Sequence, residues 1–246
     1  MKITKEDLIN SGIDPSLYTP EDMEIIEAYA DRIKEGALPS LLEEITLRDP
    51  NEAELRALII QNRDNTLDRI REIIAVLNRV YELCSQRQGI FSSSLSTEDT
   101  ERITSGGADA LSEMFEIKDK ALDHVTLMFN YKSRLSKVRA EYNKRLYSAG
   151  MLNAAFSVIC PDEDNFAITE TIGTAFEMFN ELTEVANDVN DRVIIFDEAL
   201  NYKLTRAWYD MTAALDLDND GAALNTQAVK SAIESAKQML KDVIER

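Results

Sequence analysis

The sequence predicts an all-α fold, an elongated antiparallel bundle of three long helices, and three observations support this prediction. Proline is absent between Asn51 and Cys160 and again between Asp162 and Arg246. Because proline in a helix interior costs about 3 kcal/mol, such stretches favour long helices. Apolar residues recur through both stretches at spacings of three and four, which is typical of helices that bury one face. The connections are short, so neighbouring helices are expected to run antiparallel.

The first 48 residues are expected to form short helices. A capping-box pattern at Thr4-Lys5-Glu6-Asp7 begins the first helix, and Gly12 closes the turn after it. The second helix begins at Thr19-Pro20-Glu21-Asp22, with a capping hydroxyl, a first-turn proline and two acids, and Gly36 ends it. A brief helix from Leu41 to Leu47 follows.

The first long helix is expected to begin at Asp49-Pro50-Asn51-Glu52 and to end near Gln88-Gly89. Its apolar stripe is interrupted near the middle by Asn62 and Thr66. Polar residues on such a seam can fix the register between helices, or they can mark the place where the stripe curves away from its partner.

After a turn over residues 89–96, the second long helix is expected to restart at Ser96-Thr97. Ser105-Gly106-Gly107 predicts a break or kink, and Gly150 predicts the stop. Residues 151–168 are interpreted as a buried connector or short helix and then a loop. The apolar stripe of this helix contains Leu111, Met114, Phe115, Leu122, Val125, Met128, Phe129, Leu135, Val138, Tyr142 and Leu146.

The third long helix is expected from about Thr169 to Leu215, with a nearly unbroken repeat of threes and fours. A final amphipathic helix, capped by Asn225 or Thr226, is expected to pack back on the bundle. The third stripe contains Ile172, Phe176, Phe179, Leu182, Ala186, Val189, Val193, Phe196, Leu200, Leu204, Ala207, Met211 and Leu215. We therefore divide the chain into a short-helix region, 1–48, and a long-helix bundle, 49–246, with one continuous domain over 1–246 as the alternative.

Charge is distributed in blocks. Residues 132–145 hold six bases and one acid, whereas residues 162–198 hold eleven acids and one base. If the second helix turns back into the third, these two blocks lie side by side and neutralise each other, and both also suit the dipoles of their helices.

The overall charge excludes some partner classes. The formal net charge is −18, from 45 acids and 27 bases, so the chain should repel nucleic-acid phosphate and anionic lipid. We expect no nucleic-acid partner, although the basic block with Tyr131, Tyr142 and Tyr147 is the one place that could contact one. No run of about 18 apolar residues and no apolar signal segment is present, and two cysteines make no disulfide framework. We expect an intracellular, cytoplasmic protein, or one within a particle assembled there, without a membrane partner.

One motif could bind a metal ion. In Asp216-Leu217-Asp218-Asn219-Asp220-Gly221, alternate carboxylates followed by glycine resemble the first half of an EF-hand calcium loop. Asp216, Asp218 and Asp220 are the candidate ligands for Ca²⁺. The twelfth position of the loop, Gln227, departs from the pattern because it cannot supply the bidentate carboxylate. The alternative interpretation is a capping turn without a metal.

Residues for catalysis are scarce. His124 is the only histidine, and the nearby acids do not make the paired Glu-x-x-His motifs of a di-iron bundle. No phosphate-binding glycine loop or nucleophile elbow is present. Near the end of the third helix, Trp208 with Tyr202 and Tyr209 is a candidate interface anchor, although Trp208 follows the apolar stripe closely enough to be a core residue.

These features predict a non-catalytic structural or scaffold subunit of a larger assembly, for example a component of a viral or phage particle. It is expected to bind protein partners or further copies of itself through its helix faces, without a cofactor. The first alternative is a Ca²⁺-responsive helical regulator with a degenerate EF-hand-like loop at 216–227. The second alternative is an enzyme built in a helical bundle.

Overall fold

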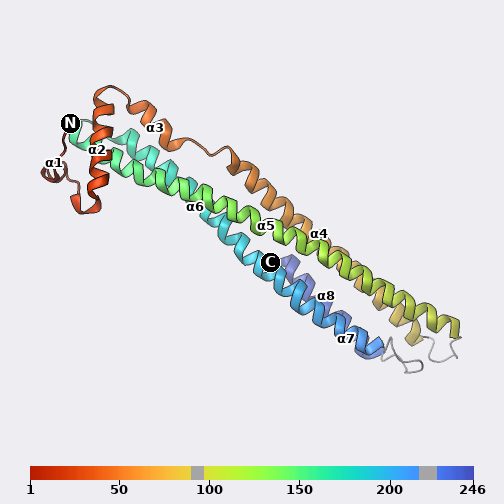
Figure 1. Cartoon of the computed structure of the whole chain (residues 1–246). Helices are drawn as coiled ribbons and strands as arrows, with labels where there is room; N and C mark the ends of the chain where they lie inside the picture. Colours follow the sequence, from red (N-terminus) through yellow and green to blue (C-terminus); the bar gives the residue numbers. More distant parts are fainter. Residues whose placement is uncertain (90–96, 216–225) are drawn as a thin grey trace. The chain divides into compact units, whose positions relative to one another are not determined.

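The computed structural model describes residues 1–89, 97–215 and 226–246, and every regular element in these ranges is a helix. The predicted all-α bundle is confirmed, with long antiparallel helices, short N-terminal helices and a C-terminal helix that packs back (Figure 1). The N-terminal helices are α1 (Lys5–Asn10), a 3₁₀ turn η1 (Pro15–Leu17), α2 (Pro20–Lys34) and α3 (Leu38–Thr46). They are followed by α4 (Asn51–Gly89), α5 (Thr97–Ile159), α6 (Phe166–Asp197), the π-helical segment η2 (Glu198–Leu204), α7 (Thr205–Leu215) and α8 (Thr226–Glu245).

Two compact units divide the chain. The first contains residues 1–56 and 133–187, and the second contains residues 57–132 and 188–246. The chain passes between them within α4, α5 and α6. The division into a short-helix region, 1–48, and a long-helix bundle, 49–246, stays a prediction.

The starts and stops expected for the first two helices are confirmed, whereas the third helix, expected from Leu41 to Leu47, begins at Leu38 and ends at Thr46. Thr4 with Asp7 and Thr19 with Asp22 form capping boxes. In each pair the threonine side chain accepts from the backbone N–H of the aspartate, and the aspartate side chain accepts from the backbone N–H of the threonine. Gly12 and Gly36 follow α1 and α2 with φ of +76° and +83°. Only glycine adopts this conformation without strain, which explains why both helices end there.

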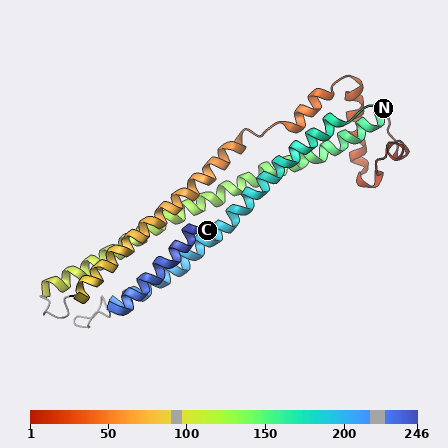
Figure 2. The ribbon, with the colours of Figure 1, turned by 180° about the vertical axis from the view of Figure 1, so that it is seen from behind.

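The core of the first unit joins α1, α2 and α3 to the end of α5 and the beginning of α6. The end of α5 and the beginning of α6 run side by side in opposite directions (Figures 1 and 2). The buried side chains of this core are Ile3, Leu8, Ile26, Ala30, Ile33, Leu41, Ile45, Ala149, Met151, Leu152, Ala154, Ala155, Phe156, Ile168 and Ala175.

Two expected interruptions of the second long helix are wrong. α5 continues through Ser105-Gly106-Gly107 and through Gly150 to Ile159, so residues 151–159 are its buried C-terminal end rather than a connector. A Cβ atom on Gly106 would lie 3.5 Å from Cδ1 of Leu83, and one on Gly150 would meet nothing within 4 Å. Glycine lowers the propensity for helix by about 1 kcal/mol, but packing along a long helix outweighs that cost.

The second unit is a bundle of α4, α5, the η2–α7 run and α8. Leu83 of α4 lies beside Gly106 of α5, and Arg79, one turn earlier in α4, pairs with Glu113, which lies later in α5. The two helices therefore run antiparallel. α8 packs along α7 and η2, and the two helices lie side by side in both views (Figures 1 and 2). Lys230 and Lys237 of α8 place their ammonium groups 5.2 and 5.3 Å from the ring centre of Tyr81 on α4.

The pairing predicted between the two charge blocks stays a prediction. Within the first unit, Glu181 of the acidic block binds Nη2 of Arg56 on α4 at 3.1 Å, and Lys144 of the basic block binds Glu141 of its own helix at 2.7 Å.

The described parts of the chain include no helix with the length and the apolar character that a membrane span requires.

Candidate functional site

The lone histidine belongs to a polar layer inside the second unit. Nδ1 of His124 lies 3.2 Å from Oδ1 of Asn62, and the buried hydroxyl of Thr66 donates to the carbonyl of Asn62 at 2.8 Å. The amide of Asn62 donates to the carbonyl of Leu58 at 2.8 Å. Asn62, one of the two polar residues that interrupt the stripe of α4, therefore faces His124 of α5, where polar pairing can set the register of the two helices.

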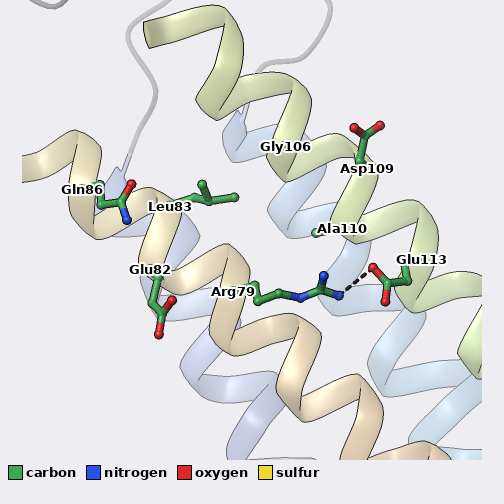
Figure 3. A pocket seen from close by; sticks show the side chains of 8 residues that line it. All are labelled: Arg79, Glu82, Leu83, Gln86, Gly106, Asp109, Ala110 and Glu113. Carbon is green, nitrogen blue, oxygen red and sulfur yellow. Dashed lines mark hydrogen bonds and ion pairs between the residues drawn. The ribbon is translucent and has the colours of Figure 1, made fainter.

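A polar hollow of about 320 Å³ lies between α4 and α5, beside Gly106. Its wall contains one ion pair, with Nη2 of Arg79 2.6 Å from Oε2 of Glu113 (Figure 3). The other two carboxylates, Glu82 and Asp109, point away from this pair and from each other. The hollow therefore has no pair of converging carboxylates for acid–base chemistry.

The candidate calcium ligands Asp216, Asp218 and Asp220 lie outside the described residues, so the metal site stays a prediction. Among residues 1–89, 97–215 and 226–246, no cluster of three His, Cys, Asp or Glu residues could hold a metal ion.

An apolar groove of about 460 Å³ runs between α5 and the α6–η2 helix in the second unit. Three large side chains on its walls are exposed: Phe129 is 51% exposed, Ile194 is 64% exposed and Tyr202 is 69% exposed. Asp197 and Glu198 add carboxylates to the same wall as Ile194. Because exposed apolar side chains gathered around a groove mark interaction surfaces on soluble proteins, this apolar groove is the strongest candidate site.

The π-helical segment η2 forms part of the wall of the apolar groove. The core residues Phe196, Leu200 and Leu204 are spaced four and four apart, which inserts one extra residue into the repeat of threes and fours. All three residues are buried in the structure. π segments of this kind occur frequently at functional sites.

A second groove of about 360 Å³ lies between η2–α7 and α8. Tyr202 contributes to the walls of both grooves, so it forms the ridge that separates them. The charges differ on the two sides of this ridge. Asp197 and Glu198 border the apolar groove, whereas two bases and one acid, Lys203, Arg206 and Asp210, border the second groove.

The aromatic residues at the end of the third long helix divide into two roles. Trp208 packs on Phe115 of α5 with ring centres 4.9 Å apart, which agrees with its interpretation as a packing residue. Tyr202 and Tyr209 are 69% and 60% exposed, so they are available as interface anchors.

Phe129 and Phe176 fit the apolar stripes by their spacing, but both are about half exposed. Their neighbours Met128 and Ala175 take the core positions instead. Consecutive residues point about 100° apart on a helix, so a pair of adjacent apolar residues cannot share one narrow stripe. The adjacent pair Met128-Phe129 is the sequence signal that points to an exposed Phe129 on the wall of the apolar groove.

Two of the tyrosines in the basic block have structural roles. Tyr142 is buried and donates to Oε2 of Glu52 at 3.0 Å, and Tyr147 donates to Oδ2 of Asp22 at 2.7 Å. The hydroxyl groups of both side chains therefore bind acids of the first unit, and the absence of a nucleic-acid partner stays a prediction.

Comparison of the sequence with models of known protein families found no match, and comparisons with curated proteins and with solved structures found none either.

Proposed function

We propose that this chain is a non-catalytic structural or scaffold subunit that binds protein through exposed helix faces, principally at the apolar groove. The observation that carries this proposal is the exposure of Phe129, Ile194 and Tyr202 around one groove of about 460 Å³. Burying a side chain of this size contributes about 1.5–3 kcal/mol, so covering all three supplies several kcal/mol toward association. A subunit of a viral or phage particle is one setting in which such a surface is used.

The arrangement of the long helices supports a binding role rather than a catalytic one. The polar hollow beside Gly106 holds a single ion pair, and the His124 ring faces a buried amide within the bundle. The apolar groove instead has the aromatic side chains Phe129 and Tyr202 on its walls, and aromatic residues are enriched at protein interfaces.

The test removes the apolar walls of the groove. The double variant Phe129→Ser/Ile194→Ser should abolish association with the native partner or with further copies, measured by sedimentation velocity and by capture from the native source. The matched control is Ile60→Ser on α4, because Ile60 is 49% exposed and belongs to the same unit. A wild-type chain that sediments as a monomer at high concentration and recovers no stable partner would contradict the proposal.

A further inference from the structure

Five exposed side chains form a line along one helical run of the second unit. They are Ile194 at the end of α6, Glu198 and Tyr202 in η2, and Arg206 and Tyr209 in α7. Glu198 and Arg206 are largely exposed, as are the three apolar members. Four-residue steps stay close to one face here because the turns of a π segment hold more than 3.6 residues. We name these five residues the ridge stripe.

The order of the ridge stripe is self-complementary. Glu198 lies four residues before Tyr202 and Arg206 lies four residues after it, so both are about 6 Å from Tyr202 along the axis. Ile194 and Tyr209 lie at the two ends, eight and seven residues from the centre. Reversing the direction of the stripe exchanges acid for base and leaves apolar residues at both ends and the aromatic residue in the middle.

We propose that the ridge stripe binds a second copy of this chain, antiparallel, across a twofold axis at Tyr202. This inference rests on the proposed function and names the partner. A twofold axis makes every contact occur twice, so Glu198 of each copy meets Arg206 of the other, and the two Tyr202 rings meet at the axis. An arginine and a carboxylate can form two parallel hydrogen bonds, which adds geometric specificity to the attraction.

The grooves on either side of the ridge complete the interface. In this register, Tyr209 of one copy reaches Ile194 of the other at the mouth of the apolar groove, where Phe129 forms the opposite wall. The stripe covers 15 residue steps, or about 22 Å of helix. A stable dimer buries on the order of 1,000 Å² or more, and the walls contributed by α5 and α8 extend the contact beyond the stripe.

To pair across the axis, Glu198 and Arg206 must exchange their ion-pair partners within the same copy for partners in the other copy. Glu198 binds Nζ of Lys203 at 2.9 Å, and Nε of Arg206 lies 3.2 Å from Oδ1 of Asp210. Both pairs are exposed and therefore contribute little to stability. Lys203 stays close to Glu198 and Asp210 stays close to Arg206, so every charge keeps a neighbour of opposite sign after the exchange.

The test uses charge reversal in the full chain. Glu198→Lys alone and Arg206→Glu alone each place two like-charge contacts across the axis, so each should weaken dimerisation on the order of 10- to 100-fold in sedimentation equilibrium. A 1:1 mixture of the two variants should dimerise again. In the mixed dimer the introduced lysine of one copy meets the introduced glutamate of the other, and the unchanged Arg206 and Glu198 meet each other, so both contacts are attractive. The control Glu72→Lys on α4, where Glu72 pairs with Arg69 at 2.7 Å, should dimerise as the wild type does.

The outcomes separate this inference from the proposed function. A wild-type dimer that neither reversal weakens overturns the ridge stripe but leaves binding through another helix face intact. Two monomeric variants that stay monomeric when mixed overturn the antiparallel register. A monomeric wild type overturns self-association, and the proposed function then depends on whether Phe129→Ser/Ile194→Ser loses a different protein partner. Circular dichroism of each variant must match the wild type for the comparison to apply.

Discussion

Removal of one buried hydroxyl group should destabilise the first unit measurably. The ring of Tyr142 on α5 is buried, and its hydroxyl group lies at the start of α4. It accepts from the backbone N–H of Asp49 at 3.1 Å and donates to Oε2 of Glu52 at 3.0 Å. Glu52 is itself buried, and its other carboxylate oxygen lies 3.4 Å from Nε of Arg56. Tyr142→Phe leaves the ring in place and removes both hydrogen bonds.

The magnitude follows from the two bonds. A hydrogen bond to a charged group contributes about 1.5–3 kcal/mol and a neutral bond about 0.5–1.5 kcal/mol, so the free energy of unfolding should fall by about 2–4 kcal/mol. Each kcal/mol lowers the Tm of a chain this size by about 2–4 °C. Urea unfolding followed by circular dichroism measures the change, and the dependence of the unfolding free energy on urea concentration should be unaltered.

A double-mutant cycle with Glu52→Gln distinguishes this network from general loss of packing. If Tyr142 acts through Glu52, the effects of the two substitutions are not additive, and the coupling should be about 1 kcal/mol or more. The exposed Tyr202→Phe, measured at low protein concentration, serves as the control and should change stability by less than about 0.5 kcal/mol. The reasoning is wrong if Tyr142→Phe lowers the free energy of unfolding by less than about 0.5 kcal/mol, or if the effects of Tyr142→Phe and Glu52→Gln are additive.

Three further predictions concern pH, helix glycines and calcium. The pKa of Asp22 is lowered by hydrogen bonds from the hydroxyl of Tyr147 and from Thr19, so its stabilising contribution is present above the ordinary aspartate pKa and is lost as pH falls through the lower folded value. Acid titration of Tm should show this loss, and Tyr147→Phe should shrink it. If the two acid titrations are identical, the hydroxyl has no role. Gly106→Ala should stabilise the chain by about 0.5–1 kcal/mol, because a Cβ there meets only ordinary contact at 3.5 Å. Gly36→Ala should destabilise it, because φ is +83°. Thermal unfolding of both variants checks these signs, and equal shifts in one direction would contradict them. If the 216–227 loop binds calcium, Ca²⁺ should raise Tm and Asp218→Ala should abolish the rise, whereas an unchanged wild-type Tm would discard the calcium alternative.

Local signals predicted the helix starts better than the helix interiors. Capping boxes at Thr4 and Thr19 and positive-φ glycines at Gly12 and Gly36 act within one turn, so their effects can be read from neighbouring residues. The same local rules give wrong stops at Gly106 and Gly150. The helix that contains these two glycines is supported by buried side chains between Ala110 and Phe156, and a local rule does not include such packing.

The candidate site was predictable only in part. The sequence identifies Tyr202 and Tyr209 as candidate anchors, and they are exposed. The predicted stripe contains both Met128 and Phe129, but only Met128 is buried in the structure. The sequence-based prediction lacks the π segment Glu198–Leu204, because buried residues at the same four-four spacing also occur in the ordinary α-helix α4, at Asn62, Thr66 and Ile70.

The sequence by itself determined that this chain is built of long helices, where most of them begin, and that the last helix returns to the bundle. Periodicity and capping are properties of neighbouring residues, so they are present before any tertiary contact forms. Only the tertiary structure decided which of two adjacent apolar residues faces the core, that His124 meets Asn62, and that exposed Phe129, Ile194 and Tyr202 surround one groove. These outcomes depend on the rotation of each helix against its neighbours, which is set by the packing of the whole interface.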